Sequence, residues 1–173
     1  MKFYVLDSSH IAEEYVSVSD ELKDISLICS ASEFQHLTKE PRTVELKDAS
    51  GKIWPDFINE NGIPLISDKM KLFLVQNGVD YLFYKKIIFR RSKEEYVYWL
   101  ALPERISCLN LDESVIDDLF GTVEHFAINE DKIGRYEIFK LKGVTNLEII
   151  VTESLAEKIK SQKFTGVYLL NLR

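Results

Sequence analysis

The N-terminal segment contains the residue types of a nucleophilic triad in four consecutive positions. In order they are Asp7, Ser8, Ser9 and His10. The members of a serine hydrolase triad, however, come from separate parts of the chain and meet across the fold. Because a short apolar run at residues 3–6 comes directly before them, we interpret the segment as a first strand that ends in a capped turn.

A second candidate is the acidic stretch LDESVIDDL at residues 111–119. Its carboxylates are oxygen ligands of the kind that divalent cations prefer, but the stretch lacks the spacing and the glycine of an EF-hand. We interpret residues 114–119 as a short helix with a solvated acidic face. Alternatively, the stretch faces a cationic partner and raises the association rate more than the final affinity. Its carboxylates are Asp112, Glu113, Asp117 and Asp118.

Motifs of known catalytic and cofactor sites are missing from the sequence. The three histidines are scattered, and none lies beside a cysteine at a metal-ligand spacing. The seven glycines are isolated, so there is no glycine-rich phosphate loop, and no Gly-x-Ser-x-Gly elbow occurs. We therefore expect no metal, no cofactor and no catalytic residues. The alternative is an enzyme whose site is assembled from dispersed residues, such as a carboxylate with His125 or Tyr136.

Aromatic residues make up 12% of the chain and cluster in its middle. Large aromatic side chains near an acidic surface often anchor protein interfaces, but they also fill the cores of sheets. For strand residues such as Phe83 and Trp99 we favour the core. Trp54, in the loop-like segment KIWPDF, is the hardest to explain in that way. We predict that a partner protein contacts Trp54 and Asp56 together with the four carboxylates of residues 111–119.

The sequence signals for the strands and helices that must position these residues are weak near the N-terminus. Polar clusters separate short apolar pieces between residues 7 and 52. We predict strands at residues 25–29 (ISLIC) and 43–46 (TVEL), because both are rich in residues that favour strands.

From residue 53 onward the pattern is sharper. Residues 64–66 are a predicted strand, and Asn77-Gly78 marks the end of a helix. Residues 81–89 and 96–102 are rich in strand formers and are joined by a polar connection, which predicts an antiparallel pair. The second of these shows no clean alternation, so we expect a central strand that is covered on both faces.

One sequence pattern occurs twice in the chain, at an offset of 85 positions. Residues 66–85 and 151–170 each begin with an apolar residue, a hydroxyl and an acid, continue for the length of a helix, and end in an aromatic-rich strand. We predict two strand–helix–strand units that pack into one mixed, mainly antiparallel sheet, in an α+β fold. The alternative is that two unrelated segments converge on a common motif. The repetition indicates architecture and no particular chemistry.

The start of each helix in these units has a physical explanation. The hydroxyls of Ser67 and Thr152 can accept a hydrogen bond from a free backbone N–H and so cap the helix. In the second unit, Ser154 with Glu157 offers a competing capping box. Spacings of three and four residues predict a buried stripe on each helix. These stripes are Met70, Phe73 and Leu74 in the first helix, and Leu155, Ala156 and Ile159 in the second.

Length and composition indicate a globular protein. A chain of 173 residues suits a single domain 1–173, in which residues 1–52 are weakly patterned and residues 53–173 are better patterned. The net charge of −6 argues against nucleic-acid binding, which needs a concentrated basic face. No apolar run suits a signal peptide or a membrane span, so we expect a cytoplasmic protein without membrane contact. Cys29 and Cys108 have no metal-type spacing and are expected as reduced, half-buried thiols.

Five segments of the chain share their order and spacing with a known family. They are WPDF at residues 54–57, PLISDKM, VYWLALPERISCLNLDES, YEIFKLKG and the final IIVTESLAEKIKSQKFTGVYLLNL. In this order they resemble bacterial immunity proteins of polymorphic toxin systems, of the type called immunity family eleven, which are encoded beside toxin genes. The resemblance covers residues 53–173. Asn110 stands where the family often has an aspartate.

The resemblance implies a cytosolic protein that binds a cognate protein toxin and blocks it in the producing cell or its kin. The family has no established catalytic residues, so none are carried over. A dispersed-site enzyme or small-ligand-binding protein would instead show a pocket with convergent polar groups and strongly shifted pKa values. A homo-oligomeric structural protein would show a large, symmetric apolar interface.

Overall fold

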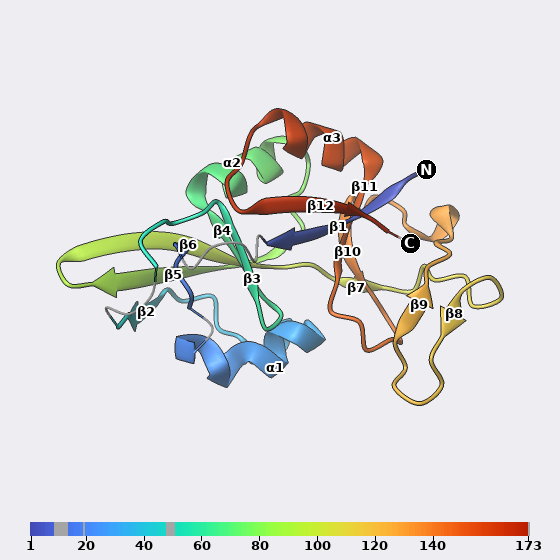
Figure 1. Cartoon of the computed structure of the whole chain (residues 1–173), viewed down its shortest axis with the longest axis horizontal. Coiled ribbons are helices and arrows are strands. Elements are labelled where there is room, and N and C mark those ends of the chain that lie inside the picture. Colours follow the sequence, from blue (N-terminus) through green and yellow to red (C-terminus); the bar gives the residue numbers. More distant parts are fainter. Residues whose placement is uncertain (9–13, 19, 48–50, 173) are drawn as a thin grey trace. The chain divides into compact units, whose positions relative to one another are not determined.

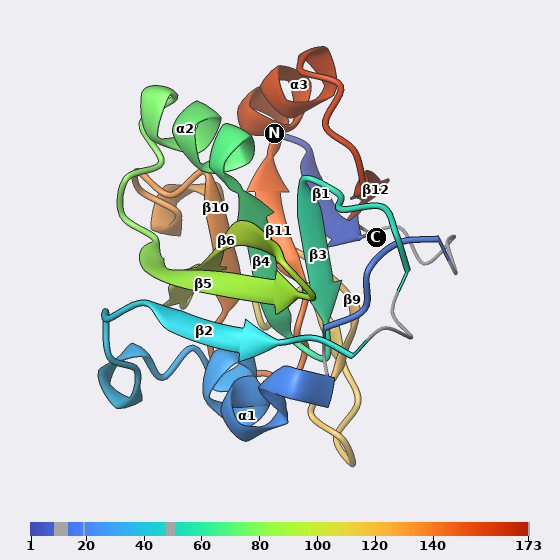
Figure 2. The same cartoon turned by 90° about the vertical axis from the view of Figure 1, so that its left-hand side faces the viewer.

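The chain divides into two units, each with its own sheet. The structure, a computed structural model, describes residues 1–8, 14–18, 20–47 and 51–172 (Figures 1 and 2). Unit 1 consists of Met1–Asp7, Pro103–Lys163 and Tyr168–Arg173, and unit 2 of Ser8–Leu102 and Phe164–Val167. The α+β class and the mainly antiparallel pairing are confirmed. A single domain stays a prediction.

Unit 2 is built on a five-stranded sheet with the order β2-β5-β6-β4-β3. The long hairpin of β5 (Phe83–Arg91) and β6 (Glu94–Leu102) forms its centre, which confirms the predicted antiparallel pair. On one side lie β4 (Ile63–Ser67) and β3 (Phe57–Glu60), both antiparallel to their neighbours. On the other side, β2 (Arg42–Glu45) runs parallel to β5. The predicted strands at residues 43–46 and 64–66 are therefore confirmed.

Residues 25–29 form part of a helix, so the strand predicted there was wrong. They lie in α1 (Lys23–Ala31), which follows the short 3₁₀ turn η1 (Asp20–Leu22). In a strand, every second side chain would share one face. Here Ile25 and Cys29, four residues apart, are buried, whereas the side chain of Leu27 between them is 81% exposed. Helical spacing therefore prevailed over the strand preference of the individual residues.

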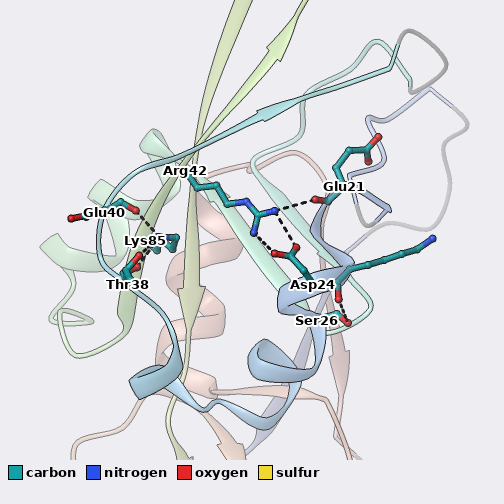
Figure 3. A network of polar contacts seen from close by, with 8 residues as sticks. Glu21, Asp24, Ser26, Thr38, Glu40, Arg42 and Lys85 are labelled. Carbon is teal, nitrogen blue, oxygen red and sulfur yellow. Dashed lines mark hydrogen bonds and ion pairs between the residues drawn. The ribbon is translucent and has the colours of Figure 1, made fainter.

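A polar network ties α1 and the following loop to the sheet (Figure 3). Arg42 on β2 donates from its two terminal nitrogens to the carboxylate of Asp24 on α1, at 2.8 and 3.0 Å. Lys85 on β5 is buried and donates from Nζ to the carbonyl and the hydroxyl of Thr38 and to the carbonyl of Glu40. Burial lowers the pKa of Lys85. The ammonium therefore fixes the loop between β2 and the 3₁₀ turn η2 (Phe34–His36).

Unit 1 is built on a second five-stranded sheet, whose order is β12-β1-β11-β10-β7. The first strand predicted from the sequence, β1 (Phe3–Ser8), lies between β12 (Val167–Asn171) and β11 (Ile149–Thr152). β10 (Ile138–Leu141) pairs antiparallel with β11 and parallel with β7 (Arg105–Ile106). The strand at the start of the chain therefore completes a sheet whose other strands come from much later in the sequence.

The repeated strand–helix–strand unit is present in both halves of the chain. The first copy is β4, α2 (Asp68–Gln76) and β5, and the second is β11, α3 (Glu153–Ser161) and β12. In each copy another strand lies between the two strands of the unit, β6 in the first and β1 in the second. The copies thus occupy two separate sheets, and the prediction of one sheet was wrong because pairing with β1 depends on contacts remote in sequence.

Equivalent positions in the two copies make similar contacts. Trp99 on β6 and Tyr4 on β1 each pair with the residue that precedes a helix cap. A lysine of the adjacent helix lies over each ring, with Lys71 Nζ 3.1 Å from the Trp99 ring centroid and Lys160 Nζ 4.3 Å from that of Tyr4. Each copy thus has a cation–π contact between its helix and its inserted strand.

Both predicted helix caps are confirmed. The Ser67 hydroxyl accepts a hydrogen bond from the N–H of Met70 at 3.1 Å, and Thr152 accepts one from Leu155 at 3.4 Å. Because α3 begins at Glu153, the competing start at Ser154 was wrong. The predicted buried stripes of both helices are confirmed as well.

Both cysteines are reduced thiols outside any disulfide, and each lies in the core of a different unit. Both are fully buried, which corrects the prediction of half-buried side chains. Burial raises the pKa of Cys108 to about 11. Because the thiolate is the reactive form, Cys108 is an inert structural side chain at neutral pH.

We expect Ser67→Ala to lower the free energy of unfolding by about 1 to 2 kcal/mol, because the helix loses its cap and the carboxylate of Asp56 loses a hydroxyl donor. Urea denaturation measures this change. Ser26→Ala is the matched control, since this partly exposed α1 hydroxyl donates to the carbonyl of Lys23 in its own helix and should cost less than about 0.5 kcal/mol. Equal losses in the two variants would contradict the role of the cap.

Candidate functional site

Four of the six predicted partner-binding residues lie in one ordered segment of unit 1. This segment, residues 110–122, is called the acidic loop here; it contains β8 (Val115–Ile116) and leads into β9 (Val123–His125). The helix predicted at residues 114–119 is therefore wrong. Strand alternation decides the structure: Ile116 and Val123 pack on the core of unit 1, whereas Val115 and His125 on the other face are exposed.

The acidic loop exposes large apolar side chains among its carboxylates. Leu119 is 82% and Phe120 66% exposed, and at least half of the surface of Leu111 and of Val115 is also open to solvent. The side chains of Asp112, Glu113 and Asp118 are exposed beside them in sequence. The sequence analysis missed the apolar members of this surface, because it considered only the carboxylates of residues 111–119. In the sequence, the one sign of an exposed apolar pair is that Leu119 and Phe120 lie between two aspartates and a glycine.

Asp117 differs from the other three acids because its carboxylate is used inside the loop. Its Oδ1 accepts hydrogen bonds from the N–H groups of both Leu119 and Phe120, each at 2.8 Å. Its own N–H donates to the carbonyl of Thr122 at 2.8 Å, and its carbonyl accepts from Gly121 at 2.7 Å. Asp117 therefore shapes the turn that presents Leu119 and Phe120.

Side chains at the base of the loop fix its ends. The side-chain oxygen of Asn110 accepts from the N–H of Asp112 at 3.2 Å, a bond that an aspartate could make equally well. Ser114 exchanges hydrogen bonds with the backbone of Ala127 at 3.0 and 3.3 Å. At the other end, the Thr145 hydroxyl donates to the carbonyl of Phe120 at 2.9 Å. The loop is thus held in one shape from both ends.

Trp54, in unit 2, is packed against the core. Its ring stacks on Tyr96 with centroids 3.9 Å apart and planes 14° apart, and it also contacts Phe89 and Tyr98 at 5.8 and 5.6 Å. It belongs to the partly buried residues around the core of unit 2. This packing accounts for the aromatic ring of Trp54 within unit 2. Contact of Trp54 with a partner stays a prediction.

Asp56, also in unit 2, joins three segments that are distant in sequence. Its carboxylate accepts from the hydroxyl of Ser67 at 2.7 Å and from the N–H and hydroxyl of Thr165 at 2.9 and 3.1 Å. Burial alone would raise the pKa of Asp56, but these donors, with Lys69 nearby, outweigh it and lower the pKa. Asp56 therefore stabilises the helix cap and the 164–167 segment, and partner contact stays a prediction.

Three segments that carry the family resemblance converge at this point. Asp56 comes from WPDF, Ser67 from PLISDKM, and Thr165 from the final segment. Gly166 has a positive φ of 73° and lies so close to this region that a Cβ atom would approach Pro55 to 2.5 Å. The residues of this chain at these positions thus have a structural explanation.

The alternative enzyme site was predicted around His125 or Tyr136, and both residues lie in unit 1. The Tyr136 hydroxyl donates to Glu104 at 2.9 Å, and this bond raises the pKa of Tyr136. Tyr136 lines a recess of about 690 Å³ in unit 1, whose other walls are mostly exposed side chains, including Glu130 and Glu157. Every carboxyl with a clearly shifted pKa in the described residues has it lowered, as suits ion pairs and hydrogen bonds.

Three further sequence predictions concern the Asp-Ser-Ser-His segment at residues 7–10, metal binding and membrane spans. Ser9 and His10 lie outside the described residues, and Ser8 donates from its hydroxyl to the carbonyl of Asn59 at 3.3 Å. In the described ranges, His, Cys, Asp and Glu side chains nowhere gather in threes as a metal site would require. The helices found there are too short and too polar to cross a bilayer.

We expect Asp56→Asn to lower the free energy of unfolding at neutral pH by about 1 to 3 kcal/mol, because the bonds to an ionised acceptor are lost. The folded-state pKa of Asp56 lies below its unfolded value, so its stabilisation is present above about pH 4 and disappears as the pH falls through the folded pKa. Denaturation from neutral to acid pH should show the two proteins converging.

Asp80→Asn, at an exposed position of the same unit, is the control for that comparison and should leave stability unchanged. A difference between wild type and Asp56→Asn that stays constant down to the lowest pH would contradict the stabilising role of the carboxylate.

Comparison with known proteins identifies the family. A model of the immunity protein family Imm11 matches residues 6–172. The match starts well before residue 53, so it includes the weakly patterned N-terminal residues. No curated protein gave a significant match. Because the family model covers nearly all of its 173 residues, the chain belongs to the Imm11 immunity protein family.

Proposed function

We propose that the protein is a non-catalytic immunity protein, which binds a cognate protein toxin in the cytoplasm of the producing cell and neutralises it. The family match over residues 6–172 carries this proposal. Its partner is a protein, and neither nucleic acid nor a membrane is a partner. Neutralisation by binding requires a stable scaffold and one complementary surface, and no reacting group.

The chemistry of the side chains supports binding over catalysis. A catalytic acid or base is commonly recognised by a pKa shifted towards neutrality in a closed pocket. The carboxyls with lowered pKa values described above are instead held in ion pairs and hydrogen bonds. The acidic loop, by contrast, exposes Leu119 and Phe120 to solvent, as an interface does before its partner binds.

The test is protection in cells. We expect deletion of the gene in the native bacterium to make it sensitive to its kin, and the tagged protein to retain one protein in near-equal amount at physiological salt. That protein should stop growth when expressed alone in a foreign host, and co-expression of the wild-type chain should restore growth. An unrelated acidic protein of similar size is the control.

Two results would contradict the proposal. One is a deletion strain that grows normally beside its kin while nothing is retained by the tagged protein. The other is a small metabolite bound in the recess beside Tyr136, with turnover by the purified protein, which would favour the enzyme alternative.

A further inference from the structure

We propose that the acidic loop is the docking surface for the toxin, and that Leu119 and Phe120 enter an apolar recess of the toxin that is rimmed by lysine and arginine side chains. The inference rests on the proposed function and names the surface and the partner chemistry that the family match does not supply. Four features of the loop carry it: exposed apolar side chains, a fixed shape, unbalanced charge, and an acid used to position the turn.

The apolar side chains are the first feature. Leu119 and Phe120 are adjacent and are 82% and 66% exposed, although most apolar side chains of this size in unit 1 lie in or against its core. An aromatic side chain with an apolar neighbour is the usual centre of an interface hot spot, where a few residues carry most of the affinity. The pair is therefore suited to anchor a partner.

The second feature is that the pair is held in place before binding. Asp117 accepts from the N–H groups of both residues, and Thr145 donates to the carbonyl of Phe120. Four backbone groups around the tip are also paired, because Gly121 donates to Asp117 and accepts from Thr145. A loop that is already ordered loses little conformational entropy on binding, so its contacts translate more fully into affinity.

Charge is the third feature, and it selects the partner. The sequence has no lysine or arginine between Arg105 and Lys132, whereas seven acidic residues occur there. The exposed acids beside the apolar pair would repel an anionic membrane surface, nucleic acid, or the same loop of a second copy. A basic protein surface is the complementary partner. Exposed charges of this kind mainly raise the association rate.

The fourth feature separates Asp117 from its neighbours. Asp117 is a positioning residue, because its Oδ1 is committed to the N–H groups of Leu119 and Phe120. Asp117→Asn keeps an oxygen acceptor at this place but loses the charge, whereas Asp117→Ala loses both. If the acid acts by shaping the turn, the asparagine should retain binding and the alanine should not.

The experiment measures binding kinetics with the toxin that the wild-type chain neutralises, immobilised in an inactive form, at about 50 and about 300 mM NaCl. Phe120→Ala should raise the dissociation rate at least tenfold, with a smaller change in the association rate. The matched control is Leu27→Ala in α1 of unit 2, an apolar side chain 81% exposed, which should bind like wild type.

The charge is tested by a triple variant, Asp112→Asn, Glu113→Gln and Asp118→Asn. It should associate several-fold more slowly at low salt and lose most of the salt dependence, with its dissociation rate nearly unchanged. The control removes three exposed acids of unit 2, through Glu14→Gln, Glu33→Gln and Asp80→Asn. Circular dichroism and urea denaturation confirm that each variant is folded.

The outcomes separate the inference from the proposed function. If wild type does not bind any toxin that it protects against, neutralisation by binding fails. If wild type binds while Phe120→Ala and the triple variant bind equally well, the docking surface lies elsewhere and only the inference is overturned. Weakening of equal size by Asp117→Asn and Asp117→Ala would overturn the positioning role and indicate direct contact by the charge.

Discussion

The fold depends on a hydroxyl side chain at the point where a core strand becomes a helix. In unit 2 this is Ser67 and in unit 1 it is Thr152, and each accepts a hydrogen bond from the N–H three residues later. The free N–H groups of a first helical turn are costly when they are buried without partners, so the cap lets the chain reverse direction next to the core. Asp56 extends this arrangement in unit 2 by binding Ser67 and Thr165 together.

We propose that stability and recognition rest on different residues among those that the sequence singled out. Trp54 and Asp56 have neighbours that account for them within unit 2, through ring stacking and through hydrogen bonds. The acidic loop of unit 1 is different, because Asp117 stabilises a turn in which the side chains of Leu119 and Phe120 are exposed to solvent. Under the proposed function, such a division would allow the loop surface to change with the partner while the scaffold keeps its packing.

Local signals in the sequence predicted the local structure. The caps, the buried stripes of α2 and α3, and the β5–β6 hairpin follow from spacings within a few residues. The strand predicted at residues 25–29 was wrong because the prediction considered the strand preference of each residue by itself. The burial of Ile25 and Cys29, four residues apart, is the spacing of a helix. The place of β1 could not be predicted, because its partner β11 lies at the far end of the sequence. The acids of the loop were found from composition, but its apolar tip depends on hydrogen bonds by Asp117 that only the structure reveals.

We propose above all that a toxin binds at the acidic loop of unit 1. The most direct measurement is hydrogen–deuterium exchange of the chain alone and in complex with its toxin. We predict slower exchange on binding at residues 110–122, with the backbone N–H groups of Leu119 and Phe120 among those protected. Unchanged exchange throughout that segment, together with protection confined to another region of the chain, would contradict the claim.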